Sequence, residues 1–441
     1  MESRGRQITY FNTFEAREAA FNRFVAHLIP SKTAGPSRFW QEFRRIADQG
    51  LSQPPDGDLT YIMANPRDGL VFGSPFQVLA AARMAAGLVS PGDPEAIAAL
   101  ADEYGLGDQL TQPMRSLSGG ETVKLALARA KAGTPASRAL VIASPFCWLS
   151  RWNTGLLDNT IAAFQARRLD VHLLALDGED DGSEITATQG IDLLPRGPSF
   201  GLEFDGARIM LGLAVDAVQG PPLFAAIADG AWQLKSPCLV TGDNGQGKTL
   251  VAKALSRAVR VRGRARVSQG PARLLFQNVI TQTLLRSPEV LRQTARDICG
   301  AAAERALAAL IDAFVIYGGE YERVASPAAG GSLLVAKLHM VAARLCVRPA
   351  LLILDEPDWG LSRQEAAAFV LAVTTVAHAS GVALMLVSHK PWWRAMAVSR
   401  LRVAKHQRAT SDLEGDRPRF TISLCPEGPD AESGGGEVAD Q

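Results

Sequence analysis

Long apolar runs, an excess of one charge and closely spaced cysteine pairs are all missing from this sequence of 441 residues. Its apolar runs, such as 351–354 and 382–387, have the length of strands, and none approaches the roughly 20 residues of a membrane-spanning helix. The 46 Lys and Arg residues nearly balance the 45 Asp and Glu residues, which argues against a nucleic-acid-binding body. The opening MESRGRQITY has no apolar segment, so no signal peptide is expected.

The five cysteines are scattered and never paired at the spacing of a metal site. This distribution favours reduced core thiols in a cytoplasmic protein. A composition of 47% hydrophobic and 21% charged residues is ordinary for globular proteins, and the length allows two or three domains, each with its own core. The missing features therefore leave a cytoplasmic, globular, multidomain protein as the expectation.

A glycine-rich octapeptide, GDNGQGKT, is the most specific motif in the chain. It meets the pattern G-x-x-x-x-G-K-[ST], in which glycines let backbone N–H groups turn toward phosphates, the lysine reaches the outer phosphates and the hydroxyl ligates Mg²⁺. A short apolar strand precedes it and a helical stretch follows, so the helix directs its positive end at the anion. The motif predicts ATP binding by Gly242, Asp243, Asn244, Gly245, Gln246, Gly247, Lys248, Thr249 and Leu250.

Polar residues follow short apolar strands at three further places. Gln277 follows one strand, Asp355 and Glu356 end the run LLILDEP, and His389 follows LMLVS. An Asp at the end of a buried strand beside a phosphate loop can hold Mg²⁺ through water, and Glu356 can polarise the attacking water. Elsewhere a D-E-P triplet is most often the start of a helix. Gln277 or His389 alone would carry no assignment.

The same order of segments occurs twice along the chain, which indicates an internal repeat. In the second half we expect the strands 238–242, 272–276, 350–354 and 382–387 and the helices 250–261, 333–345 and 363–379. In the first half we expect the strands 24–29, 59–63, 139–143 and 171–176, with PSKTAGPS (30–37) at the loop position and LSGGE at 117–121. This alternation predicts an α/β fold with mainly parallel sheets covered by helices. The predicted domains are 1–195, 196–425 and a disordered acidic tail, 426–441.

Lys248, Gln277, the Asp355-Glu356 pair and His389, in this order, resemble the ATP-binding cassette (ABC) ATPases over nearly the whole chain. The resemblance implies two P-loop NTPase domains, each with a helical signature subdomain, paired head to tail. It implies that Lys248, Gln277, Glu356 and His389 are catalytic, with Gln277 as the Q-loop residue and His389 as the switch histidine on the γ-phosphate. The segment 358–362 would be the D-loop. The Mg²⁺ ligands implied are Thr249, Gln277 and Asp355.

The resemblance also implies that each ATP lies between the phosphate loop of one cassette and the signature of the other. The first half carries a signature that differs from LSGGQ only at its last position. Its residues are Leu117, Ser118, Gly119, Gly120 and Glu121. The site built from this signature and the second-half loop has every chemical part, so we expect it to hydrolyse ATP.

The opposite composite site lacks the residues expected for binding and hydrolysing ATP. Prolines stand in 30–37 where the first glycine and the lysine belong, and proline has no N–H to offer a phosphate. The facing signature reads AAGGS at 328–332. At the places of Asp, Glu, His and Gln stand Ala143, Ser144, Asp177 and Ala64. We expect this site not to hydrolyse ATP, so that one chain forms an intramolecular cassette pair with a single working site.

Two roles stay open for such an ATPase. One is the motor subunit of a membrane transporter at the inner face of the cell membrane, with separate membrane-spanning subunits. The segment 65–72, NPRDGLVF, is similar to the energy-coupling-factor (cobalt/vitamin) importer ATPases and favours this role. The alternative is a soluble ABC mechanoprotein that remodels a client protein. A translation or DNA-repair role is disfavoured, because the sequence has neither a long charged linker nor zinc-type cysteine pairs.

Overall fold

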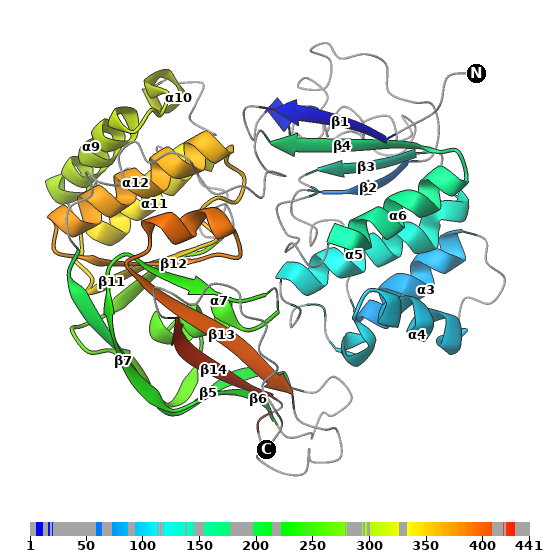
Figure 1. Ribbon diagram of the computed structural model, residues 1–441, viewed down its shortest axis with the longest axis horizontal. Coiled ribbons are helices and arrows are strands. Elements are labelled where there is room, and N and C mark those ends of the chain that lie inside the picture. The colour runs from blue at the N-terminus through cyan, green and yellow to red at the C-terminus, as the bar shows by residue number, and fades with distance from the viewer. Residues whose placement is uncertain are drawn as a thin grey trace.

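The computed structural model shows two α/β lobes, one from each half of the chain (Figure 1). It describes residues 6–11, 16–17, 20, 59–63, 73–86, 93–112, 114, 117, 119–136, 139–143, 145, 154–176, 197–213, 222–243, 245–277, 279, 293, 296–297, 300–325, 333–407, 418 and 420–427. In these residues no helix has the length and apolar character needed to cross a membrane. The predicted boundary at 195–196 lies outside them.

The first lobe is a four-stranded parallel sheet covered by helices. Its strands run in the order β1 (Arg6–Phe11), β4 (Asp170–Leu176), β3 (Ala139–Ala143) and β2 (Leu59–Ile62). All five residues of β3, ALVIA, are buried, as expected for a central parallel strand covered on both faces. The helices are α3 (Pro75–Ala85), α4 (Pro94–Glu103), α5 (Gly119–Gly133) and α6 (Thr154–Ala166), with short 3₁₀ turns at Gly107–Gln109 and Thr134–Ala136.

The second lobe contains a larger sheet of ten strands. Five parallel strands form its core in the order β10 (Ala272–Leu275), β11 (Leu351–Asp355), β12 (Ala383–Val387), β8 (Cys238–Thr241) and β13 (Ser399–Gln407). The sheet continues through β14 (Phe420–Glu427), β6 (Pro222–Ile227), β5 (Ser199–Leu213) and β7 (Gly230–Lys235), and β9 (Val261–Val267) pairs with β5. Its helices are α7 (Lys248–Leu255), α9 (Ala301–Ile316), α10 (Tyr321–Ala325), α11 (Leu333–Leu345) and α12 (Arg363–Ala379), with a 3₁₀ turn, η9 (Pro391–Met396).

The predicted repeat is present, but one strand was assigned wrongly. The first-lobe order β1-β4-β3-β2 corresponds strand by strand to β8-β12-β11-β10 in the second lobe. The strand at the phosphate-loop position is therefore Arg6–Phe11, not the predicted 24–29, which lies outside the described residues. At the other end of the chain, β14 runs to Glu427, so the predicted tail began two residues too early.

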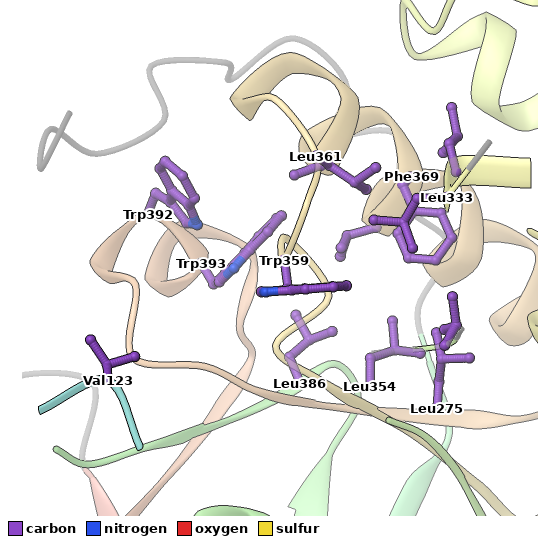
Figure 2. Packing of buried hydrophobic residues seen from close by; sticks show 14 of the residues in the cluster. Val123, Leu275, Leu333, Leu354, Trp359, Leu361, Phe369, Leu386, Trp392 and Trp393 are labelled. Carbon is purple, nitrogen blue, oxygen red and sulfur yellow. The ribbon is translucent and has the colours of Figure 1, made fainter. Parts of the chain in front are cut away.

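Buried side chains of both lobes belong to one hydrophobic cluster. Figure 2 shows part of this cluster. Val123 of α5 lies on the same side as Trp392 and Trp393, and the Trp393 ring lies beside Trp359. The cluster therefore gives the two lobes a shared apolar contact. Cys238 and Cys425 are free thiols, whereas Cys346 is disulfide-bonded, so the expectation of reduced thiols is wrong for Cys346.

Candidate nucleotide site

One edge of the second-lobe sheet collects the motifs that the sequence singled out. β10, β11, β12 and β8 are adjacent and parallel, so their carboxyl ends meet at the same edge. Gln277 follows β10, Asp355 ends β11, His389 follows β12 and Gly242 follows β8. This edge is where ligands bind in open α/β sheets. Four segments that are far apart in sequence are thus brought together.

The phosphate loop has a backbone that only glycine adopts easily. Gly242, Gly245 and Gly247 have φ values of 137°, 85° and 100°. A Cβ on Gly242 would lie 2.5 Å from the carbonyl oxygen of Val403, and one on Gly247 would lie 2.5 Å from a methyl carbon of Ile422. The loop turns directly into α7, whose N-cap Gly247 has no side chain to cap the first N–H groups. These groups remain available to an anion.

Lys248 is almost fully buried at the start of α7, with 6% of its surface exposed. Its Nζ donates to the carbonyl oxygens of Gly242 at 2.5 Å and Asp243 at 3.0 Å. Burial lowers the pKa of Lys248, while the carboxylates of Glu356 and Asp355 act in the opposite direction. The ammonium group is therefore held over the loop, where a phosphate could replace the carbonyl oxygens. Asn244 lies outside the described residues.

Thr249 and Asp355 form the part of the site that fits a magnesium ion. Thr249 Oγ1 donates to Asp355 Oδ1 at 3.1 Å, and Asp355 is 3% exposed. Burial, and to a lesser degree the neighbouring Glu356, raise the pKa of Asp355 to about 7, against the opposing effect of the Thr249 hydrogen bond. A buried carboxylate beside a hydroxyl is a suitable oxygen set for Mg²⁺. Gln277 lies half-buried beyond β10, at the same edge.

Glu356 is held by three contacts around a strained backbone. Its φ is 45°, a left-handed conformation that is uncommon for a side chain of this size. Its backbone N–H donates to the carbonyl oxygen of Val387 at 2.8 Å. Ser388 Oγ donates to Oε2 at 3.0 Å, and His389 Nδ1 lies 3.0 Å from Oε1. Burial alone would raise the pKa of Glu356, but His389, Lys248 and Ser388 lower it on balance, so the carboxylate stays ionised.

The other ring nitrogen of His389 is unsatisfied. Within the described residues, Nε2 is buried and has no hydrogen-bond partner. Because Nδ1 faces the Glu356 carboxylate, Nε2 is the ring nitrogen that remains for a ligand. A phosphate oxygen is the kind of acceptor that this atom needs. A nucleoside triphosphate thus fits Lys248, the uncapped start of α7 and His389, and its metal fits the Thr249–Asp355 pair.

The first-half signature lies at the start of a helix, as predicted. α5 begins at Gly119, while Leu117 is buried and Gln109 Nε2 donates to Glu121 Oε1 at 3.5 Å. Ser118 lies outside the described residues. In Figure 1 the N-terminal end of α5 points toward the second lobe, on the side of β13 and α7. Its helix dipole is therefore directed toward that side of the second lobe.

Comparisons with known proteins agree with this geometry. No protein-family model matches the chain. Over 163 residues it is 28% identical to the zinc import ATP-binding protein ZnuC of Jannaschia sp. (strain CCS1) and 31% identical to that of Cereibacter sphaeroides. Each match covers 34% of this chain and 60% of the relative, so the chain spans about three fifths of these relatives' length.

A solved structure extends the likeness to both lobes. The model of ribosome-bound archaeal Pelota and ABCE1 matches 96% of this chain and 74% of its own, with a TM-score of 0.51 and 13% identity, which shows a shared fold. The chain is similar in sequence to ABC ATPases and has their fold. Its two lobes are two ABC-type cassettes in tandem.

Strand register shows how far the first cassette departs from the second. Thr9 is the counterpart of Val240, because the two occupy equivalent positions in their paired strands. Arg17 lies eight residues after Thr9, and Lys248 lies eight residues after Val240. Both residues are helical. Arg17 is fully buried. The first-cassette loop therefore starts at Phe11 and has no glycine, and the assignment to 30–37 was wrong.

The same register corrects the counterpart of the switch histidine. Ala143 occupies the place of Asp355, as predicted. Leu176 occupies the place of His389, one residue before the predicted Asp177. Leu176 is 1% exposed and continues β4. Ser144, Ala64 and Asp177 lie outside the described residues.

A pair of arginines shows that α11 corresponds to α5. Arg129 donates to the carbonyl oxygen of Tyr61 in β2, and Arg344 donates to that of Leu274 in β10, which holds the equivalent position. The predicted counterpart of the signature, AAGGS at 328–332, lies outside the described residues and stays a prediction.

Proposed function

We propose that the chain hydrolyses ATP at one composite site, formed by the phosphate loop of the second cassette and the signature of the first. The observation that carries this proposal is the grouping of Lys248, Asp355, Glu356 and His389 at one sheet edge, with His389 Nε2 left without a partner. Mg²⁺ would neutralise phosphate charge and orient the β- and γ-phosphates.

Each residue then has a separate task. The loop N–H groups and Lys248 would bind the phosphates, and Thr249 and Asp355 would hold the metal, with Gln277 at the same sheet edge. Glu356, ionised and fixed by Ser388 and His389, accepts the hydrogen bond of the attacking water. His389 Nε2 and the start of α5 stabilise negative charge on the γ-phosphate.

The opposite composite site is proposed to be inactive. By register, its loop lacks the glycines that the second-cassette loop requires, and apolar Ala143 and Leu176 replace the carboxylate and the histidine. The facing signature, predicted at 328–332, reads AAGGS and has no serine at its second place. Neither half of this second site has the chemistry to bind a triphosphate.

Two measurements test the composite site. Because both cassettes belong to one chain, ATP turnover per chain should not change with protein concentration. Ser118→Arg should abolish turnover by placing a long side chain at the γ-phosphate. The matched control, Ala329→Arg at the second place of the second-half AAGGS segment, should keep turnover within twofold. Equal effects of the two substitutions, or turnover that rises with concentration, would contradict the single intramolecular site.

We further propose that this ATPase is a transporter motor of importer type. The sequence relatives named as zinc import ATP-binding proteins and the NPRDGLVF segment support this role. The alternative is a mechanoprotein acting on a protein client, supported by the tandem-cassette fold shared with the ABCE1 model. Affinity purification from the native membrane fraction separates them: multispanning subunits support the motor, and a stoichiometric soluble client supports the mechanoprotein.

A further inference from the structure

The hydroxyl of Ser388 lies between two buried carboxylates. Its Oγ is 3.0 Å from Glu356 Oε2 and 3.4 Å from Asp358 Oδ1. A hydroxyl has one hydrogen, so it can donate to only one of them at a time. The backbone N–H of Lys390 donates to Ser388 Oγ at 3.1 Å and occupies part of its acceptor capacity. Of these two oxygens, the one that receives no other hydrogen bond will attract the Ser388 hydrogen more strongly.

Asp358 has a second donor in a buried tryptophan. Trp393 Nε1 donates to Asp358 Oδ1 at 3.3 Å, and Trp393 is 0% exposed. An indole can only donate, so this contact always stabilises the Asp358 carboxylate. The neighbouring Trp392 differs in this respect: its Nε1 is buried without a partner in the described part of the chain. Figure 2 shows the Trp393 ring between Trp392 and Trp359.

The backbone around Asp358 is also held by a buried lysine of α11. Lys337, 1% exposed in α11, donates from Nζ to the carbonyl oxygens of Pro357 and Trp359 at 2.6 Å each. These carbonyls flank Asp358 on both sides. These hydrogen bonds therefore fix the backbone on both sides of Asp358.

We infer that Trp393 and Asp358 are positioning residues for Glu356: the indole satisfies Asp358, which leaves the Ser388 hydrogen to orient the Glu356 carboxylate. This inference rests on the proposed role of Glu356 in ATP hydrolysis. Neither Trp393 nor Asp358 contacts the phosphate loop through any hydrogen bond in the described residues. They act through Ser388 alone.

Trp393→Phe tests the inference by removing the N–H and keeping an aromatic ring. Asp358 would then compete for the Ser388 hydrogen, and the Glu356 carboxylate would lose its fixed orientation. We expect kcat to fall about tenfold, as for the loss of one hydrogen bond to a charged group, with KM for ATP changed less than twofold. The matched control is Trp392→Phe, which removes an N–H without a partner. It should leave both constants within twofold.

A compensating substitution separates positioning from general damage. In the double variant Trp393→Phe/Asp358→Asn the competing charge is gone, so most of the lost kcat should return. Among single variants, Asp358→Glu should lower kcat about tenfold, because it brings the carboxylate closer to Ser388, and Asp358→Asn should lower it less than threefold. These single variants test the inference even if Trp393→Phe does not fold.

The outcomes are distinguishable from failure of the proposed function. If the unaltered chain releases no phosphate from Mg-ATP, the proposed function fails. If it does, but Trp393→Phe behaves like Trp392→Phe, or the double variant shows no recovery, only the inference is overturned. A rise in KM for ATP with an unchanged kcat would also overturn it, because positioning of the base acts after ATP has bound.

Discussion

Replacing Asp355 by Asn should make the nucleotide-free protein more stable, and by an amount that grows with pH. In the folded protein burial raises the pKa of Asp355 to about 7, from an ordinary value of 3.8. The folded state therefore disfavours the charged form. Stability is lost as the pH rises from the ordinary value toward 7, and the loss stays constant at higher pH. Asn keeps the shape and still accepts the Thr249 hydrogen bond without carrying charge.

The expected size follows from the shift. One pKa unit corresponds to about 1.36 kcal/mol. The gain in unfolding free energy should thus be about 2 kcal/mol at pH 5 and about 4 kcal/mol at pH 8. Urea unfolding followed by tryptophan fluorescence measures it, because Trp359 and Trp393 are buried in this cassette. An equal difference at both pH values, or a less stable variant at pH 8, would refute the reasoning.

Nucleotide should reverse the order of stability. On the proposed function, Mg-ATP should bind the folded state of the unaltered protein and stabilise it in proportion to the logarithm of nucleotide concentration. The Asn variant lacks the carboxylate that the metal needs and should gain much less. If saturating Mg-ATP stabilises both proteins equally, Asp355 is not part of the metal site.

Three further perturbations test the assigned roles. Glu356→Gln should keep ATP binding and reduce phosphate release about 10²–10⁴-fold, as expected for loss of a general base, and normal turnover would show that another group activates the water. Lys248→Ala should abolish ATP binding in equilibrium titrations, with circular dichroism as the folding control, because no other buried cation is seen over the loop in the described residues. Arg17→Lys and Pro36→Lys should each leave turnover within twofold, since by register the first-cassette loop has no glycines; a large gain would show that this site is nearly competent.

The second-cassette site was largely predictable because its signals are local. Each of β10, β11 and β12 is a short apolar run that ends on a polar motif, and parallel strands place such ends at one edge. The bounds of α11 and α12 were also predicted correctly. What the sequence could not show is how Glu356 is held, because the contacts with Ser388 and His389 depend on the register of β11 and β12.

The first cassette was harder because its register depends on distant pairing. The segment FVAHLI at 24–29 is more apolar than RQITYF, and the following PSKTAGPS resembles a worn loop, so local patterns favoured the wrong strand. Only the pairing of Arg6–Phe11 with β4 sets the position. The counterpart of the signature stays a prediction, because the Gly330-Gly331 pair is visible in the sequence but lies outside the described residues.

The first cassette has apolar residues where the second has polar site residues, and this difference has a physical reason. The replacements fall at strand ends, where Ala143 and Leu176 replace Asp355 and His389, and spare the apolar strands themselves. A buried carboxylate at this place costs the second cassette about 4 kcal/mol in the absence of nucleotide, by the argument from its pKa. A cassette that no longer binds nucleotide cannot offset that cost, so an apolar residue there stabilises it. The first cassette would then serve as a stable frame that presents α5 to the working site. On this reasoning Ala143→Asp should destabilise the protein above pH 7 without creating a second site.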